Sequence, residues 1–195
     1  DVEFHEYVVT LPLDLPLGYH DVALSADNDE FARSRLIVAP EACYTPNEIK
    51  EGKKIWGLSV QLYCVRSEKN WGIGDFSDLA LLIEKAAGVG ADFIGLNPIH
   101  ALYPANPNAC SPYGPSSRRW LNYLYIDVTA IDGYDDASVQ AVVNSDEFKA
   151  TLEHARNVEH VDYEAVAHLK LAALKAVFDV YDAKYLRKST KQNKA

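Results

Sequence analysis

The stretch LSVQLYCVRSEKNWGIGDFSDLALLIEKAAGVGADFIGL, residues 58–96, decides the fold class. Its first part, Leu58–Val65, is mostly apolar, as buried parallel strands are. A glycine-rich turn leads to Asp75, a good helix N-cap, and apolar residues then follow at helical spacing. Glycines end this helix, and residues 92–96, which are apolar or glycine after Asp92, are the next strand. The segment therefore predicts a strand–helix–strand unit, in which Cys64 lies in the core, and an α/β fold class.

The first 45 or so residues have a different pattern. Three short runs are rich in β-forming residues: 7–11, 20–24 and 35–38. Turn-forming residues separate the runs, including the Asp/Asn-rich turn at 26–29. Such strands make a small sheet or part of a sandwich. Because Pro40 and Pro46 mark a linker, the predicted domains are 1–46, the end of a β-domain, and 47–195.

Beyond residue 96 the pattern predicts one more strand, Tyr123–Val128, and two helices. Ser145 or Asp146 caps the first helix, which runs through Arg156, and Asp162 caps the second. An apolar stripe on the second helix is typical of core packing. The stripe consists of Val166, Leu169, Leu174, Val177, Phe178 and Tyr181.

The composition, 48% hydrophobic and 24% charged, is that of a globular protein. A formal net charge of -9 argues against nucleic acid and anionic membranes as main partners. The three cysteines, Cys43, Cys64 and Cys110, have neither metal-site nor disulfide spacing. We therefore expect reduced thiols, a cytoplasmic location, no metal and no cofactor. Because methionine is absent, we expect the chain to be processed or part of a longer polypeptide.

Polar and aromatic residues follow the strand that ends at Leu96. Asn97 and His100 come almost directly after it, and SPYGPSSRRW occupies residues 111–120. A change from apolar to polar at the C-terminal end of a strand is typical of the mouth of a binding site. Aromatic rings beside hydroxyls and amides suit a sugar, which has apolar ring faces and a fringe of hydroxyls. A proline-rich surface loop with packed aromatic residues is the alternative.

Three motifs stand in order along the chain: WGIGDF at 71–76, GLNPIHALYP at 95–104 and SPYGPSSRRWLN at 111–122. Together they resemble the amylomaltases, or 4-α-glucanotransferases, of the bacterial maltodextrin-utilising type, which carries an extra N-terminal β-domain. LGYH at 17–20 and LIVAP at 36–40 resemble the last strands of that domain. The resemblance implies a small N-terminal β-domain, part of a sandwich, followed by the first βα units of an incomplete (β/α)8 TIM-type barrel with inserted helices. A closed barrel of about 250 residues does not fit the chain.

The resemblance also implies an activity. Such enzymes cut an α-1,4 bond in a malto-oligosaccharide and pass the glucan to another sugar, glucose or maltose included, by a retaining double displacement with two carboxylates. No segment matches the motifs that carry the family's nucleophile, acid/base residue or third carboxylate. The chain therefore resembles an N-terminal portion, which we expect to be inactive alone and able to form a dimer. The alternative is a non-catalytic α-glucan-binding module or scaffold.

The resemblance makes Tyr113 the first candidate for sugar contact, because the Tyr of the family's Ser-Pro-Tyr motif stacks under the glucose at the cleavage point. Ser111 and Asn97 are candidates for hydrogen bonds to hydroxyls, with turn and strand-end roles as alternatives. His100 is either structural or a donor to substrate. Trp71 is the remaining substrate-binding candidate, as a stacking platform.

Other polar residues carry open or structural interpretations. Arg118 and Arg119 either organise carboxylates of the barrel or lie on the surface. Asp127 is taken as structural, as the resemblance implies. His154 and His160 are six residues apart and do not share a helix face, which argues against a metal pair.

Overall fold

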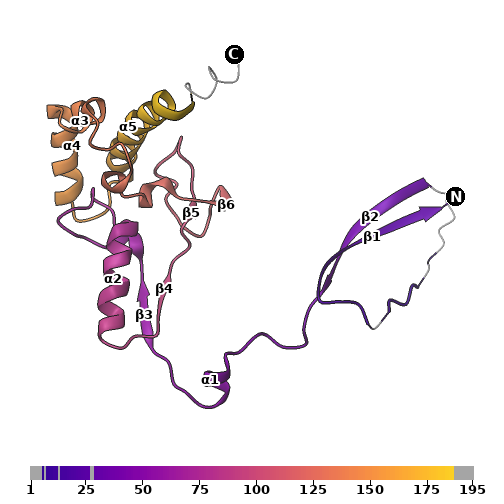
Figure 1. The fold of residues 1–195 in the computed structure, drawn as a ribbon. Coiled ribbons are helices and arrows are strands. Elements are labelled where there is room, and N and C mark those ends of the chain that lie inside the picture. Colours follow the sequence, from indigo (N-terminus) through magenta and orange to yellow (C-terminus); the bar gives the residue numbers. More distant parts are fainter. Residues whose placement is uncertain (1–5, 7, 13, 27–28, 187–195) are drawn as a thin grey trace. The chain divides into compact units, whose positions relative to one another are not determined.

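The computed structural model describes residues 6, 8–12, 14–26 and 29–186 (Figure 1). The chain divides into two compact units, Asp1–Lys54 and Ile55–Ala195. The first unit is a β hairpin with a short helix, and the second combines small sheets with helices. The predicted α/β class with small sheets is confirmed.

The first unit contains an antiparallel hairpin of β1 (Gly18–Ala26) and β2 (Asp29–Val38). An ion pair of 3.3 Å between Arg35 Nε and Asp21 Oδ1 links the two strands. The one-turn helix α1 (Asn47–Lys50) follows in the same unit. Figure 1 shows the hairpin as two long arrows.

Two of the three predicted N-terminal strands are confirmed, those at 20–24 and 35–38. The strand predicted at 7–11 is wrong over residues 8–11, which form no strand, and residue 7 lies outside the described residues. Within the turn predicted at 26–29, residues 27–28 also lie outside the described residues. A β-rich composition alone does not make a strand, because a strand also needs a neighbour to pair with.

The predicted strand–helix–strand unit is present in the second unit. Strands β3 (Gly57–Val60) and β4 (Phe93–Leu96) pair in parallel, with helix α2 (Phe76–Gly88) between them in the chain. The first strand is shorter than predicted, because the chain turns at η1 (Leu62–Cys64) and buries Leu62. Cys64 is exposed, so its predicted place in the core is wrong.

The predicted cap of α2 is confirmed. The Asp75 carboxylate accepts hydrogen bonds from the backbone N–H groups of Ser77 and Asp78, and Asp78 accepts in return from the N–H of Asp75. This reciprocal arrangement is a capping box, and it satisfies amide groups that a helix start leaves unpaired.

The strand predicted at Tyr123–Val128 is wrong. The chain forms two 3₁₀ turns there, η2 (Tyr123–Tyr125) and η3 (Val128–Ala130). The side chain of Asn122 accepts from the Leu124 N–H, and that of Asp127 accepts from the Thr129 N–H. These local bonds offer the backbone an alternative to a sheet. The strands in this region are instead β5 (His100–Ala101) and β6 (Ser117–Leu121), which pair antiparallel.

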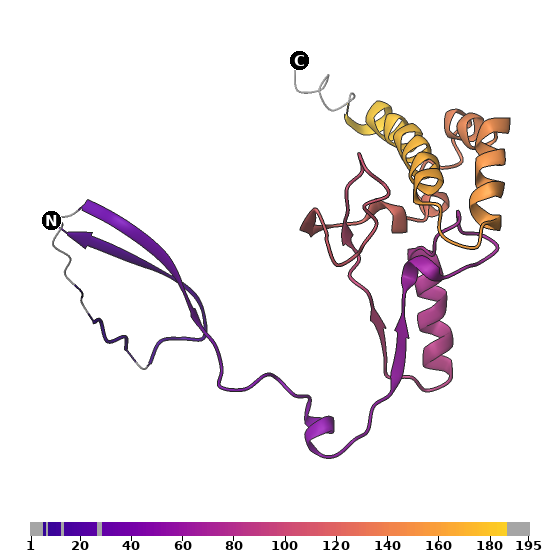
Figure 2. The same cartoon turned by 180° about the vertical axis from the view of Figure 1, so that it is seen from behind.

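Three helices complete the second unit: α3 (Ala137–Val143), α4 (Asp146–Asn157) and α5 (Tyr163–Tyr181), with a π-helical turn, η4 (Asp182–Leu186), after α5. Of the two caps predicted for α4, Ser145 is confirmed, since its side chain accepts from the Phe148 N–H. The predicted cap of α5 is confirmed as well, since Asp162 accepts from the Ala165 N–H. Figures 1 and 2 show α3, α4 and α5 side by side. The sequence did not predict α3.

The core of the second unit lies between these helices, the 3₁₀ turns and the loop before α2. Its innermost apolar side chains are Leu62, Ile73, Val128, Val139, Val166 and Leu169. The predicted stripe of α5 is only partly buried, because Phe178 and Tyr181 are exposed. Across the described residues, no helix is long and apolar enough to cross a membrane.

Candidate functional site

The structure brings Asn97 and Tyr113 together. Asn97 follows the last residue of β4, and its Nδ2 donates a hydrogen bond of 2.9 Å to the Tyr113 hydroxyl. The Tyr113 side chain is otherwise open, with 70% of the residue exposed. The amide therefore fixes the tip of a tyrosine whose ring remains accessible, as a stacking platform for a sugar requires.

The β5–β6 ribbon places this tyrosine. Ala101 pairs with Ser117 and His100 with Leu121, so residues 118–120 form an irregular bulge in β6. Backbone bonds from Ser116 N to Ala101 O (2.9 Å) and from Asn122 N to Ile99 O extend the ribbon at both ends. Bulges of this kind re-aim side chains beside functional sites.

A pocket of about 210 Å³ lies beside the ring of Tyr113. We call it the Tyr113 pocket, and its lining residues are Pro98, His100, Pro112, Tyr113, Pro115 and Arg118. His100, one of the residues predicted for the site, lies on β5 and lines the same pocket as Tyr113. Its Nδ1 is buried and has no hydrogen-bond partner among the described residues.

Two other candidates lie elsewhere. Ser111 is exposed on the loop before Tyr113, where its carbonyl accepts from the Gly114 N–H at 3.2 Å, and it does not line the pocket. Trp71 is 5% exposed and packs edge-on against Phe148, with ring centroids 5.3 Å apart. The structure therefore places Trp71 in the core, where its ring has no open face for a sugar.

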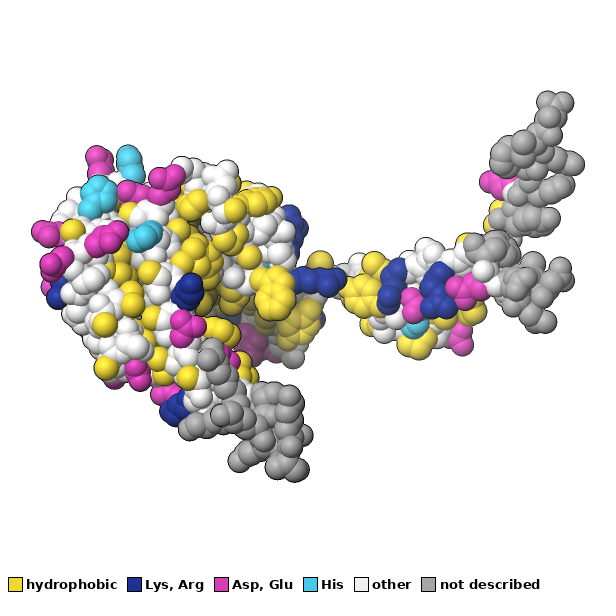
Figure 3. Space-filling view, turned by 90° about the horizontal axis from the view of Figure 1, so that it is seen from above, with side chains coloured by type: hydrophobic (Ala, Val, Ile, Leu, Met, Phe, Trp, Pro, Cys, Tyr) yellow, Lys and Arg dark blue, Asp and Glu magenta, His cyan; other side chains and the backbone are white. Residues whose placement is uncertain are grey.

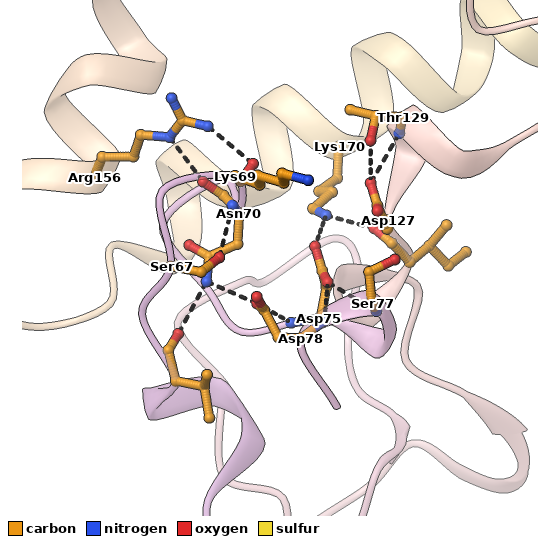
Figure 4. A network of polar contacts seen from close by, with 12 residues as sticks. Ser67, Lys69, Asn70, Asp75, Ser77, Asp78, Asp127, Thr129, Arg156 and Lys170 are labelled. Carbon is orange, nitrogen blue, oxygen red and sulfur yellow. Dashed lines mark hydrogen bonds and ion pairs between the residues drawn. The ribbon is translucent and has the colours of Figure 1, made fainter. Parts of the chain in front are cut away.

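A buried polar network, which the sequence analysis missed, lies in the same unit (Figure 4). Lys170 on α5 is 1% exposed, and its Nζ lies 3.9 Å from the Oδ2 of Asp75. The ammonium also donates to the Ile126 carbonyl and lies over the ring of Trp71. A signal existed: Lys170 occupies a position four residues after Val166, on the buried face of an apolar helix.

Burial governs the ionisation of this pair. It lowers the pKa of Lys170, although Asp75, Asp127 and Asp78 act in the opposite direction. Burial likewise raises the pKa of Asp75, against the opposing effects of the Asp78 amide and of Lys170. Removing an ionisable group from water disfavours its charged form. The opposite charge of the partner offsets part of that cost.

Asp127 has the opposite balance. Burial opposes its charge, but hydrogen bonds from Ser77 and Thr129 and the nearby Lys170 outweigh it, so its pKa lies below the ordinary value. Together with Asp75 and Asp78 it lines a second pocket, of about 640 Å³. Each of these carboxylates is engaged in a helix or turn cap. Within the described part of the chain, no group of three or more His, Cys, Asp or Glu residues could hold a metal ion.

Arginines fasten the loop before α2 to the helices. Arg156 on α4 donates to the carbonyls of Asn70 (2.7 Å) and Lys69 (2.9 Å), as Figure 4 shows. Arg66 donates in turn to the carbonyls of Gly72 (2.6 Å) and Ala155 (3.3 Å). The loop that follows η1 is thereby held against α4 by charge-assisted bonds.

Comparisons with known proteins agree over both units. A family described as 4-alpha-glucanotransferase matches residues 60–195, and one described as the MalQ N-terminal beta sandwich domain matches residues 1–40. The chain is 45% identical over 175 residues to a 4-alpha-glucanotransferase of Haemophilus influenzae, covering 89% of this chain and 25% of that protein. It is 40% identical over 178 residues to one of Mycobacterium tuberculosis, covering 87% and 24%.

A solved structure is similar as well. The chain superposes on the crystal structure of amylomaltase from Corynebacterium glutamicum with a TM-score of 0.71 and 34% identity, covering 86% of this chain and 24% of that one. The chain thus spans about a quarter of the length of the relatives it matches.

Proposed function

Because the chain belongs to the 4-alpha-glucanotransferase family, we propose that the protein transfers α-1,4-glucan segments between malto-oligosaccharides, with glucose or maltose among the acceptors. The observation that carries the proposal is the pairing of Asn97 with Tyr113 at the end of β4. It supplies a fixed, open aromatic ring beside a pocket with polar groups, which suits the C–H face and the hydroxyls of a pyranose.

The proposed reaction is a retaining double displacement. One carboxylate attacks the anomeric carbon while a carboxylic acid protonates the leaving oxygen. A sugar hydroxyl then displaces the first carboxylate and gives its proton to the second group, which now acts as a base. We propose that these carboxylates lie outside this chain. Asp75 and Asp78 are held in a capping box and Asp127 caps a turn, so each already serves a structural contact. The residues of this chain bind and orient the glucan.

We propose a role for each predicted residue near the site. Tyr113 stacks against a glucosyl ring, and Asn97 holds the hydroxyl of Tyr113 through a hydrogen bond. His100 lines the same pocket. Ser111, on the exposed loop, contacts the glucan from the rim. Trp71 supports the site from the core rather than touching sugar, because its ring is buried.

The finer architecture also belongs to the proposal. The parallel strands β3 and β4, joined through α2, have the connectivity of the first βα unit of a (β/α)8 barrel, in which binding residues follow the C-terminal ends of strands. We take residues 1–46 as the end of the N-terminal β-domain and 47–195 as the first part of the barrel. The three cysteines are free, which supports a location in the reducing cytoplasm.

Incubation of the full-length protein, which includes the carboxylates proposed to lie outside this chain, with maltotriose tests the activity. Transfer predicts glucose together with malto-oligosaccharides longer than the substrate, with no net gain of reducing ends. Hydrolysis would raise the number of reducing ends. An unchanged substrate would mean that the protein does not catalyse transfer and at most binds the glucan. Either result contradicts the proposal.

A further inference from the structure

The Tyr113 pocket has the size and the walls of a site for a single sugar ring. Sites that enclose drug-sized ligands hold roughly 300–1,000 Å³, whereas this pocket holds about 210 Å³. Three of its six lining residues are prolines, whose fixed φ makes the walls rigid. A rigid pocket loses little conformational entropy when it binds.

Arg118 is the charged residue of this lining. Among the other described arginines, Arg33 and Arg35 pair with carboxylates, and Arg66 and Arg156 donate to backbone carbonyls. Within the described residues the guanidinium of Arg119 is unbonded like that of Arg118, but Arg119 does not line the pocket. Among the described residues no hydrogen bond or ion pair engages the guanidinium of Arg118. An arginine carries five N–H donors, so it can bind two neighbouring hydroxyls at once.

His100 supplies the second unsatisfied polar group. Its Nδ1 is buried and, within the described ranges, has no hydrogen-bond partner, which is costly for a polar atom. In the described part of the chain its other ring nitrogen has no hydrogen-bond partner either. A hydroxyl can both donate to and accept from an imidazole nitrogen, according to the tautomer.

We infer that Arg118 is a specificity-determining residue, whose guanidinium binds hydroxyls of one glucosyl unit stacked on Tyr113 while the His100 ring binds a further hydroxyl. The inference rests on the proposed function. It adds the residues that form hydrogen bonds with the hydroxyls of the sugar. A neutral ligand fits better than a phosphate, because the lining offers one cation among three prolines and a phosphate calls for several charged donors.

Steady-state transfer kinetics of the full-length protein with maltotriose test the inference. R118A should raise KM by roughly tenfold to a hundredfold, the range for lost hydrogen bonds to a charged group, with kcat within about twofold. R118M keeps the apolar stem and should raise KM equally, which separates lost hydrogen bonds from lost packing. H100F keeps a planar ring without nitrogen atoms and should raise KM severalfold.

Arg119 provides the matched control, because it is the next residue on β6 and does not line the pocket. R119A should keep the wild-type KM. An equal KM in R118A and R119A overturns the inference while leaving glucan transfer intact. An unchanged KM in H100F overturns the role of His100.

Two further outcomes are distinguishable. If the protein transfers no glucan, the proposed function fails, and calorimetric binding of maltose to R118A against R119A then decides the inference alone. Competitive inhibition by inorganic phosphate that R118A abolishes would identify an anion site and overturn the sugar assignment.

Discussion

Lys170 is the residue whose environment departs furthest from its ordinary one. Its ammonium is removed from water, and Asp75, the Ile126 carbonyl and the Trp71 ring surround it. A buried ion pair is weak evidence for stability in itself, since desolvation offsets much of the attraction. The two residues nevertheless depend on each other, because the charge of either one would be strongly unfavourable in the core without its partner.

Lys170→Met should therefore lower the free energy of unfolding by about 3–5 kcal/mol, because Asp75 loses its buried cation. Urea denaturation measures the change. Lys175→Met on the exposed side of the same helix is the control and should change stability little. The double variant D75N/K170M should recover part of the loss, and a double variant as unstable as the sum of the two single changes would contradict the pairing.

At the scale of elements, close approaches of the backbone fix how the loop before α2 meets α4. Gly72 has a φ of +86°, and a Cβ placed there would lie 2.5 Å from the Ala155 carbonyl oxygen. Arg66 bonds to the carbonyls of both residues. The contact thus depends on a glycine for two reasons, its backbone conformation and the space.

Gly72→Ala should destabilise the protein by about 2–5 kcal/mol, from a strained φ and an overpacked contact. Gly88→Ala is the matched control, since Gly88 ends α2 with nothing within 4 Å of its Cβ position. That change should stabilise by up to about 1 kcal/mol through a less flexible unfolded chain. Thermal unfolding of the two variants should shift in opposite directions.

The cap of α5 should make part of the stability depend on pH. The N–H of Ala165 and the neighbouring His154 hold the pKa of Asp162 below its ordinary value of 3.8. A carboxyl with a depressed folded pKa contributes stability that is present above the unfolded value and is lost as pH falls through the folded one.

Asp162→Asn keeps a capping side chain without the titration. The stability difference between wild type and D162N should thus be constant above about pH 5 and shrink as the pH falls below 3.8. Chemical denaturation across this range measures the difference. A difference that grows on acidification would show that folding raises the pKa of Asp162 and would contradict this prediction.

At the scale of the whole molecule, the second unit has open strand edges and exposed apolar side chains around β3 and β4. In the described residues β3 and β4 form a two-stranded sheet, so each has an unpaired edge. Leu58 and Phe93 on these strands and Ile83 on α2 are exposed. Figure 3 shows hydrophobic side chains open on one face of this unit. Two strands alone are marginal in water, and open edges pair with other chains.

The 195-residue chain expressed alone should therefore self-associate and unfold over a broad temperature range. Sedimentation velocity and scanning calorimetry at several protein concentrations measure both properties. Phe93→Lys, which charges the open sheet, should reduce the association. A monomer with a sharp melt that does not depend on concentration would contradict this prediction.

The sequence by itself determined the elements whose signals are local. Asp75, Ser145 and Asp162 cap the helices that they were predicted to cap, because capping bonds join groups two or three residues apart. The strand–helix–strand unit followed from periodicity, and the motifs around Asn97 and Tyr113 indicated the family.

Only the tertiary structure decided which distant residues meet. The apolar run at Tyr123–Val128 is buried like a strand, but Asx turns at its two ends fold it into 3₁₀ turns. Lys170 is a surface residue by composition, and its burial depends on Asp75 nearly a hundred positions away in the chain. The bulge in β6 brings Arg118 beside His100. Pairings across such separations leave no periodic trace in a single sequence, since they arise when strands and helices pack.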